Sequence, residues 1–123
     1  MRNLFIFAGL VGLTLAAPVP AATSDTATGA QLVKARCAVC HSVTPGKSMA
    51  GPTLAGVVGR PVGKVAGYNF SAKLAAAKGV WNVKRLDAWL ANPRALFPAS
   101  RMATRVPSAK ERAAIIAYLA TVR

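Results

Sequence analysis

The sequence predicts an all-α domain with three main helices, one short helix and long irregular loops. Helical patterns occur near the start of the folded part, in its second half and at its end, and we identify no stretch with the alternation of a strand. Residues 42–69 are dense in glycine and proline and follow neither period. Long loops in a small domain are usually functional, so we expect these loops to pack around a central apolar cofactor.

The first 22 residues are expected to be a secretory signal peptide. Met1 and Arg2 give a positive start, and Leu4–Ala17 carries no charge. Small residues follow, with cleavage expected after Ala22 or, as the nearest alternative, after Ala21. The uncharged run is shorter than the roughly 20 residues that span a bilayer. Export predicts a periplasmic protein, and an uncleaved anchor is the competing interpretation.

One folded domain is expected behind this segment. Residues 23–28 are small and polar and are expected to form a flexible lead-in, followed by the domain at 29–123. The first helix is predicted at Gly29–Arg36, where good helix formers surround an apolar stripe of Leu32 and Val33. This helix runs directly into the first cysteine.

Two further helices are predicted from their caps. Ser71 is expected to cap a short helix over residues 72–78, which ends at Gly79. Asn82 is expected to cap a longer helix over residues 83–91. The apolar face of this longer helix consists of Leu86, Trp89 and Leu90.

The last helix follows another loop. Pro93 ends the preceding helix, and residues 94–107 are expected to be irregular. Ser108 and Glu111 have the spacing of a capping box and predict a helix that runs to about Val122. Its buried face is expected to consist of Ile115, Tyr118, Leu119 and Val122.

The chain is strongly basic, with 16 Lys and Arg against three acidic residues and a formal net charge of +13. Such a chain should associate with acidic surfaces, and the attraction should weaken as salt is added. Nucleic acid is the usual partner of a basic chain, but an exported protein does not normally meet it. A cationic surface that serves only solubility is the alternative.

The motif Cys37-Ala38-Val39-Cys40-His41 carries the chemistry. It is the attachment motif for a c-type haem. Each thiol can add to one haem vinyl group, and the neighbouring histidine can place an imidazole nitrogen under the iron. The competing interpretations are a redox dithiol, which would need a βαβ setting, a zinc site, which would need four ligands, and chance.

A set of motifs in fixed order surrounds this attachment site. They are Gly29, Gly51–Arg60 with the pattern Gly-Pro-x-Leu-x-Gly-x-x-Gly-Arg, Gly67-Tyr68, Trp81, Asn92-Pro93, Pro98–Met102 and Ile116–Leu119. From about Gly29 to Leu119 the chain resembles the class I (mitochondrial-type) cytochromes c of bacteria. The resemblance implies the cytochrome c fold around one haem c, covalently bound through Cys37 and Cys40.

The resemblance also implies roles for single residues. His41 and Met102 would bind the iron, and Met49 lies too close to His41 in sequence to reach the opposite haem face. The Pro52 carbonyl would accept a hydrogen bond from His41. The remaining residues implied to contact the haem are Arg60 and Trp81, as donors to a propionate, and Tyr68. Gly29 would allow the first and last helices to approach beside Tyr118.

Two departures from the family pattern lie at the haem. Phe70 stands where the family often has a tyrosine that donates to a propionate. Thr104 stands where a phenylalanine commonly shields the haem edge and contacts partners. Neither change removes an iron ligand, but the change at Thr104 leaves haem exposure and partner identity open.

The function implied is electron transfer rather than catalysis. With both axial positions filled by protein, the iron has no open site for a substrate, and the protein is expected to be a monomeric carrier and not an enzyme. Arg36, Arg94 and Arg101 match positions around the exposed haem edge and would attract acidic surfaces of an oxidase, reductase or dehydrogenase. The alternatives are a cytochrome subunit dedicated to one periplasmic dehydrogenase and a ligand-binding or sensing cytochrome.

Overall fold

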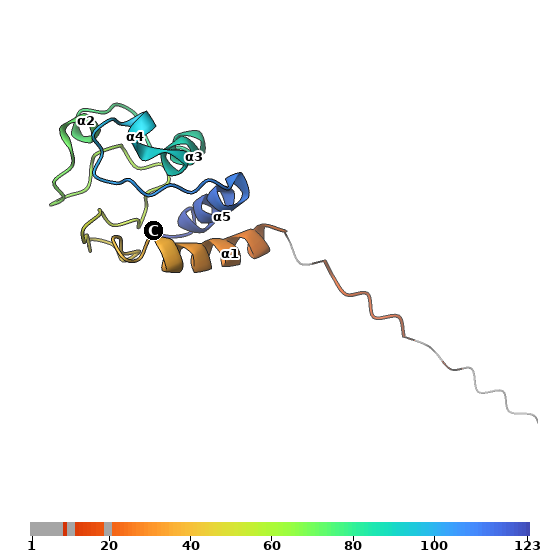
Figure 1. Ribbon diagram of the computed structural model, residues 1–123. Helices are drawn as coiled ribbons and strands as arrows, with labels where there is room; N and C mark the ends of the chain where they lie inside the picture. The colour runs from red at the N-terminus through yellow and green to blue at the C-terminus, as the bar shows by residue number, and fades with distance from the viewer. Residues whose placement is uncertain (1–8, 10–11, 19–20) are drawn as a thin grey trace, which may run out of the picture.

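The computed structural model describes residues 9, 12–18 and 21–123. The helices of this part are α1 (Ala21–Arg36), α2 (Ala72–Ala75), α3 (Val83–Ala91), α4 (Pro93–Leu96) and α5 (Ala109–Leu119) (Figure 1). The described residues form no strand beyond one isolated bridge between Pro61 and Val80. The predicted all-α class is confirmed.

The predicted signal peptide falls largely on residues outside the described ranges. Residues 9 and 12–18, which are described, form no regular secondary structure. Within the described part of the chain, no helix has the length and apolar character needed to cross a membrane. The prediction of a flexible lead-in at 23–28 was wrong, because α1 already begins at Ala21. The segment from Ala21 to Thr28 contains no glycine or proline and is rich in alanine, so nothing in it ends a helix.

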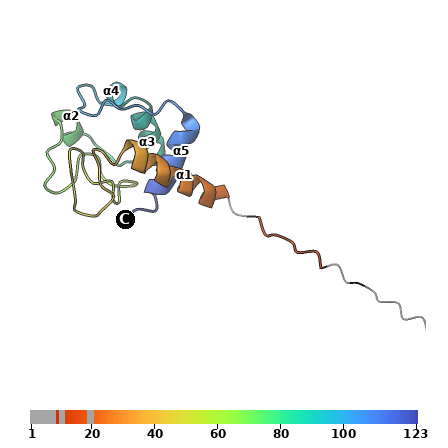
Figure 2. The same cartoon turned by 60° about the horizontal axis from the view of Figure 1, so that its bottom comes forward.

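Helices α1 and α5 cross in close contact (Figure 2). A Cβ atom added at Gly29 would overlap the backbone carbonyl of Ala114 and lie 2.8 Å from the Cβ of Tyr118. Only a glycine therefore permits this distance between the helix backbones, as the sequence predicted. The contact joins the first and last elements of the domain and leaves the end of α1 at the central cavity.

Helix α3 begins and ends as expected, but a short helix follows it. The Asn82 side chain accepts a hydrogen bond from the Arg85 backbone N–H at 2.8 Å. The expectation of a loop directly after Pro93 was wrong: Asn92 accepts from the Ala95 N–H and begins α4, with Pro93 at its first position. Proline suits that position because its missing N–H would have no partner inside the helix.

Helices α2 and α5 are shorter than the sequence predicted. Helix α2 ends at Ala75 rather than at residue 78, and the Ser71 side chain makes no cap hydrogen bond. Helix α5 ends at Leu119, before Val122. Its cap is half of the predicted box: Ser108 Oγ accepts from the Glu111 N–H at 3.2 Å, while the Glu111 carboxylate pairs with Arg36.

The glycine-rich segment between α1 and α2 is an ordered loop (Figure 1). Its backbone is fixed by hydrogen bonds from Leu54 N to Ser42 O at 2.9 Å and from Gly59 N to Trp81 O at 2.8 Å. Gly56 N donates to Val122 O at 2.8 Å, which attaches the loop to the C-terminal end. The loop thereby covers the side of the core that the helices leave open.

The core is built around a cavity rather than filled to its centre. Its buried apolar residues include Val57, Leu74, Leu86, Leu90, Val106, Ile115 and Leu119, and all seven also line the cavity. Protein interiors are normally close-packed, with few voids larger than a water molecule. The arrangement therefore indicates an apolar group that completes the core.

Candidate functional site

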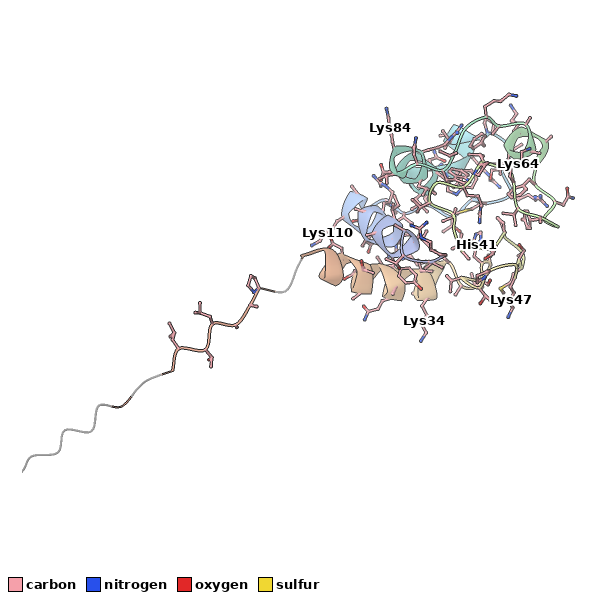
Figure 3. The ribbon with its side chains drawn as sticks, turned by 180° about the vertical axis from the view of Figure 1, so that it is seen from behind. Lys34, His41, Lys47, Lys64, Lys84 and Lys110 are labelled. Atoms are coloured by element: carbon pink, nitrogen blue, oxygen red, sulfur yellow. The ribbon has the colours of Figure 1, made fainter. Side chains whose placement is uncertain are left out.

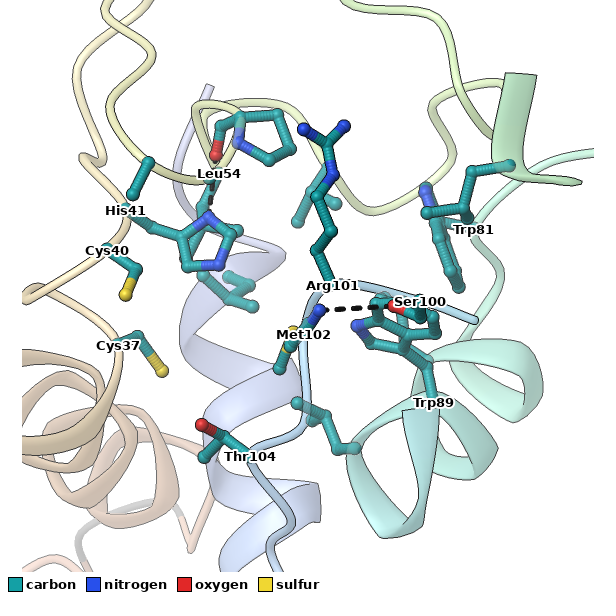
Figure 4. A pocket seen from close by; sticks show the side chains of 18 of the residues that line it. Cys37, Cys40, His41, Leu54, Trp81, Trp89, Ser100, Arg101, Met102 and Thr104 are labelled. Atoms are coloured by element: carbon teal, nitrogen blue, oxygen red, sulfur yellow. Dashed lines mark hydrogen bonds between the residues drawn. The ribbon is translucent and has the colours of Figure 1, made fainter. Parts of the chain in front are cut away.

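All eight residues predicted to contact a cofactor line this one cavity, which has a volume of about 230 Å³. They are Cys37, Cys40, His41, Pro52, Arg60, Tyr68, Trp81 and Met102. Figure 4 shows the two thiols and the imidazole on one wall and Met102 on another, with the Trp89 ring beside it. Residues separated by up to 65 positions in the sequence are thus brought to one place.

The two cysteines follow directly from the end of α1. Cys37 N donates to Val33 O at 2.9 Å, which continues the helical pattern, and His41 N donates to Cys37 O at 2.8 Å. This turn directs both sulfur atoms toward the cavity, and both are free thiols. Burial raises the pKa of the Cys37 thiol, and the adjacent Arg36 charge partly opposes that rise.

His41 is oriented by the loop that faces it. Its Nδ1 lies 2.8 Å from the Pro52 carbonyl oxygen. Because a carbonyl can only accept, the ring proton must lie on Nδ1, which leaves the Nε2 lone pair free to bind a metal. Gly51 presses against the same ring, since a Cβ added there would lie 2.5 Å from Nδ1 and 2.7 Å from Nε2. The family motif implied the role of Pro52, whereas the steric role of the neighbouring Gly51 appears only in the structure.

Met102 is placed by a loop rather than by a helix. Its backbone N–H donates to Ser100 Oγ at 3.3 Å, and Ser100 is 2% exposed. The Arg94 Nε–H donates to the Ser100 carbonyl at 3.1 Å. Ala99 has a φ of 65°, the left-handed conformation that residues with a side chain rarely adopt. Met49 lies outside this cavity and is 46% exposed, so Met102 is the methionine at the site.

Arg60 brings a buried positive charge to the cavity wall. Its Nη1 donates to the carbonyls of Thr53 and Ala55 at 2.9 and 3.1 Å. Its Nε is buried and has no hydrogen-bond partner within the described structure. Burial lowers the pKa of the guanidinium below its ordinary value, because burial disfavours the charged form. Neither ion pair of the described residues includes Arg60. An anionic group in the cavity would supply both missing interactions.

Ser71 is a site residue that the sequence analysis assigned to another role. It was predicted to cap α2, but its hydroxyl makes no cap bond and is instead buried and unpartnered at the cavity wall. The backbone of Trp81 pairs with that of Arg60, from Trp81 N to Arg60 O at 2.8 Å, which holds the indole against the same cavity. No feature of the sequence around Ser71 indicates that its hydroxyl lies at the wall of a cofactor cavity.

The rim of the cavity differs from the predicted ring of arginines. Arg36 and Arg101 line the mouth, together with Thr104, whereas Arg94 does not line it. The Arg36 guanidinium forms two hydrogen bonds with the Glu111 carboxylate, at 2.8 and 3.3 Å. Phe70 lines the cavity and packs edge-on against Tyr68, with ring centroids 4.7 Å apart.

A helical domain with two free thiols, an imidazole and a thioether around one apolar cavity defines a small haem protein of the covalent, c-type class. Comparison with known proteins gives the family. The family model "Cytochrome c" matches residues 26–123. The chain therefore belongs to the cytochrome c family and is a class I c-type cytochrome.

Relatives with similar sequences come from several organisms. The chain is 40% identical over 84 residues to "Cytochrome c2 iso-2" of Magnetospirillum fulvum, which covers 68% of this chain and 88% of that protein. It is 41% identical over 101 residues to "Cytochrome c" of Gibberella zeae, and this match covers 80% of this chain and 94% of that protein. It is 37% identical over 101 residues to "Cytochrome c-type cyt cy" of Rhodobacter capsulatus, covering 81% of this chain but only half of that protein.

Family membership implies one haem c, covalently bound through Cys37 and Cys40, and makes the chain an electron carrier. The site fits this group on three grounds. The two thiols are free and face the cavity. The walls are largely apolar and leave space within the core. Arg60 Nε and Ser71 Oγ are buried donors without partners, which a carboxylate such as a haem propionate would satisfy.

Proposed function

We propose that the protein is an exported shuttle for single electrons, with its iron held between His41 and Met102. Haem c supplies the couple between ferrous and ferric iron. The observation that carries the proposal is the position of His41 and Met102 on facing walls of the cavity that also holds the two thiols (Figure 4). A thioether is a soft ligand that disfavours the ferric state, so this pair sets a raised reduction potential.

The proposal gives a task to five of the residues that line the cavity. His41 binds through Nε2, and its bond to the Pro52 carbonyl fixes the ring and raises its basicity. Arg60 and Ser71, whose buried Nε and Oγ have no partner, would hold a propionate, and Trp81, which lines the same cavity, would donate to the same group. Tyr68 contributes its ring to the wall, since its hydroxyl already donates to the Ala50 carbonyl at 2.7 Å.

The proposed ligand pair excludes a catalytic role because it leaves no coordination position for a substrate. The test is exposure of the reduced holoprotein to carbon monoxide at neutral pH. We expect no change in its absorption spectrum, because Met102 occupies the position that carbon monoxide would take. Rapid binding would contradict the proposal and favour a ligand-binding or sensing cytochrome.

The partners are proposed to be redox proteins with acidic surfaces. Lysines lie on several sides of the domain (Figure 3), and Arg101 adds positive charge beside the cavity, where Arg36 is paired with Glu111. Exposed charges attract a partner from a distance, and salt weakens that attraction. Electron transfer to an anionic reagent should slow as salt rises, and transfer to a cationic reagent should accelerate. Retention by one dehydrogenase at high salt would instead indicate a dedicated subunit.

The location is proposed to be the periplasm. The basis is the sequence of residues 1–22, with its positive start, uncharged run and small residues before Ala22. Cell fractionation combined with mass determination of the mature chain tests the location and the cleavage site together. A periplasmic product that begins at Thr23 is expected, and a full-length product in the membrane fraction would contradict it.

A further inference from the structure

The surface formed by α2, the turn after it and the start of α3 is positively charged. Residues 61–86 contain no aspartate or glutamate, and their five cations are Lys64, Lys73, Lys78, Lys84 and Arg85. The four lysines are exposed and the arginine is half-buried. Neither ion pair of the described residues includes any of the five. The next acidic residue along the chain, Asp87, is paired with Arg112.

Contacts between side chains and backbone gather these cations onto one surface. Lys64 Nζ donates to the Ala75 carbonyl at 3.1 Å, which holds the lysine against the end of α2. Arg85 Nη1 donates to the Lys78 carbonyl at 2.6 Å, which holds the start of α3 against the turn after α2. The loop before α2, the helix itself and the start of α3 therefore form one continuous positive surface.

Two exposed valines lie among these cations. Val80 is 41% exposed, follows the turn at Lys78, and forms a backbone bridge with Pro61 in the loop before α2. Val83 is 60% exposed and begins α3, next to Lys84. We call the five cations and these two valines the α2–α3 face. Apolar side chains surrounded by charged ones are the usual composition of a protein–protein interface.

The α2–α3 face is separate from the mouth of the cavity. None of its seven residues lines the cavity. Helix α5 packs against both α1 and α3, and Figure 1 shows α1 on the opposite side of the domain from α2 and α3. Figure 3 likewise shows Lys64 and Lys84 on the opposite side from Lys34. A partner bound to this face would therefore leave the mouth open.

We propose that the α2–α3 face is a second docking surface, and that it binds a protein whose acidic surface also carries aliphatic side chains. Such a partner would hold the carrier while the mouth exchanges electrons with another protein. Charge complementarity identifies the acidic partner. A protein fits better than a lipid bilayer, because residues 61–86 expose no leucine, tryptophan or phenylalanine with which to enter a membrane interface.

The test measures how tightly the holoprotein binds a soluble synthetic peptide in which glutamate and leucine alternate. The salt concentration is about 0.1 M, at which charges more than about 10 Å apart are largely screened. The triple variant Lys64→Gln, Lys78→Gln, Lys84→Gln should bind the peptide about tenfold more weakly than the wild type, because it removes three charges from the face. Failure of the wild type to bind the peptide would overturn the proposal.

The matched control is the triple variant Lys34→Gln, Lys47→Gln, Lys110→Gln, which removes the same charge from other parts of the surface. Its affinity should stay within about twofold of the wild type. All six lysines are exposed, so the unfolding midpoints of the two variants should differ little. Equal weakening in both variants would show that binding follows net charge, and the α2–α3 face would be wrong.

A second pair of variants tests the apolar part of the face. Val83→Ser should weaken binding of the peptide about threefold. Val43→Ser, at a valine that is 37% exposed outside the face, should leave the affinity unchanged. Equal effects of the two substitutions would overturn the role of the valines.

Two further measurements test the partner and the orientation. Saturation with the peptide should not slow reduction of the ferric holoprotein by a small neutral reductant, whereas slowing would show that the peptide covers the mouth. Vesicles of equal parts phosphatidylglycerol and phosphatidylcholine should bind the holoprotein less tightly than the peptide does. Tighter binding to the vesicles that depends on the same three lysines would replace the protein partner by a bilayer and overturn the proposal. None of these readouts depends on which residue is the sixth iron ligand.

Discussion

The two walls of the cavity are held by different means. On the His41 wall, the end of α1, the Gly51 backbone and the Pro52 carbonyl all act on one imidazole. On the Met102 wall, a loop with a left-handed alanine and a long hydrogen bond carries the thioether. The first ligand belongs to a rigid local motif, whereas the second depends on contacts with distant parts of the chain. Changes on the first wall should therefore damage the protein most.

The largest effect is expected for Gly51→Ala. The new methyl group would lie within 2.7 Å of two ring nitrogens of His41, so the ring or the loop must move. We expect a loss of about 3 kcal/mol in the free energy of unfolding, together with a reduced yield of holoprotein. Denaturant unfolding and the haem content of the purified protein measure these two outcomes.

Gly46→Ala is the control for this substitution. It has a φ of 73° and open space around its Cβ position, so its cost is backbone strain alone, about 1 kcal/mol. If the two variants lost equal stability, steric support of His41 by Gly51 would not be the cause.

A smaller effect is expected for Arg60→Gln, which removes the buried charge next to the proposed propionate. The two carbonyls that Nη1 satisfies would lose a charged donor, and the buried Nε–H would no longer be available to the proposed propionate. The holoprotein should lose about 2 kcal/mol of unfolding free energy. Lys84→Gln, which removes an exposed charge on α3, should change it by less than about 0.5 kcal/mol. Similar losses in both variants would argue against an anion beside Arg60.

Ala99→Gly should stabilise the protein, because Ala99 has a strained backbone conformation in the loop that carries Met102. Glycine adopts a positive φ without the clash of a Cβ, although it has more freedom to lose on folding. We expect the free energy of unfolding to rise by about 0.5 kcal/mol. Denaturant unfolding should show a higher midpoint with an unchanged dependence of the free energy on denaturant concentration. Ala103→Gly, in the same loop but without a positive φ, should give no gain. A destabilised Ala99 variant would show that the loop is not strained.

The smallest effect is expected for Glu111→Gln at the rim. In its ion pair, the Arg36 side chain is 40% exposed and the Glu111 side chain 34% exposed. Exposed ion pairs contribute little to the free energy of unfolding. We expect a loss of about 0.5 kcal/mol or less at low salt that vanishes at high salt. A loss above about 2 kcal/mol would mean that the pair fastens α1 to α5.

The sequence was sufficient for the features that depend on local motifs. The Cys37–His41 turn and the Asn82 and Ser108 caps follow from neighbouring residue types, and the structure shows each of them. The close approach at Gly29, which the family resemblance implied, is also present. The ordered motifs also indicated which residues would meet at the cavity, though their contacts with the haem remain proposals.

Other features depend on tertiary contacts that no local pattern encodes. Ser71 has the type and position of a helix cap, but packing at the cavity wall directs its hydroxyl elsewhere. Arg101 matches a family position for a partner-binding cation, yet its guanidinium contacts the ring of Tyr68, 33 residues earlier. The pairing of Glu111 with Arg36 likewise replaced the second half of a predicted capping box. The contacts of Arg101 and Glu111 were missed because their partners lie far away in sequence, and the position of the Ser71 hydroxyl because it depends on packing at the cavity.

The proposed function depends on coordination of one iron atom by residues from both walls. The most direct measurement is the weak long-wavelength band that sulfur ligation produces in the ferric holoprotein, compared between the wild type, Met102→Ala and Met49→Leu. The band should be present in the wild type and in the Met49 variant and absent from the Met102 variant. A band that survives the loss of Met102, or that disappears with Met49, would contradict the assignment of the sixth ligand.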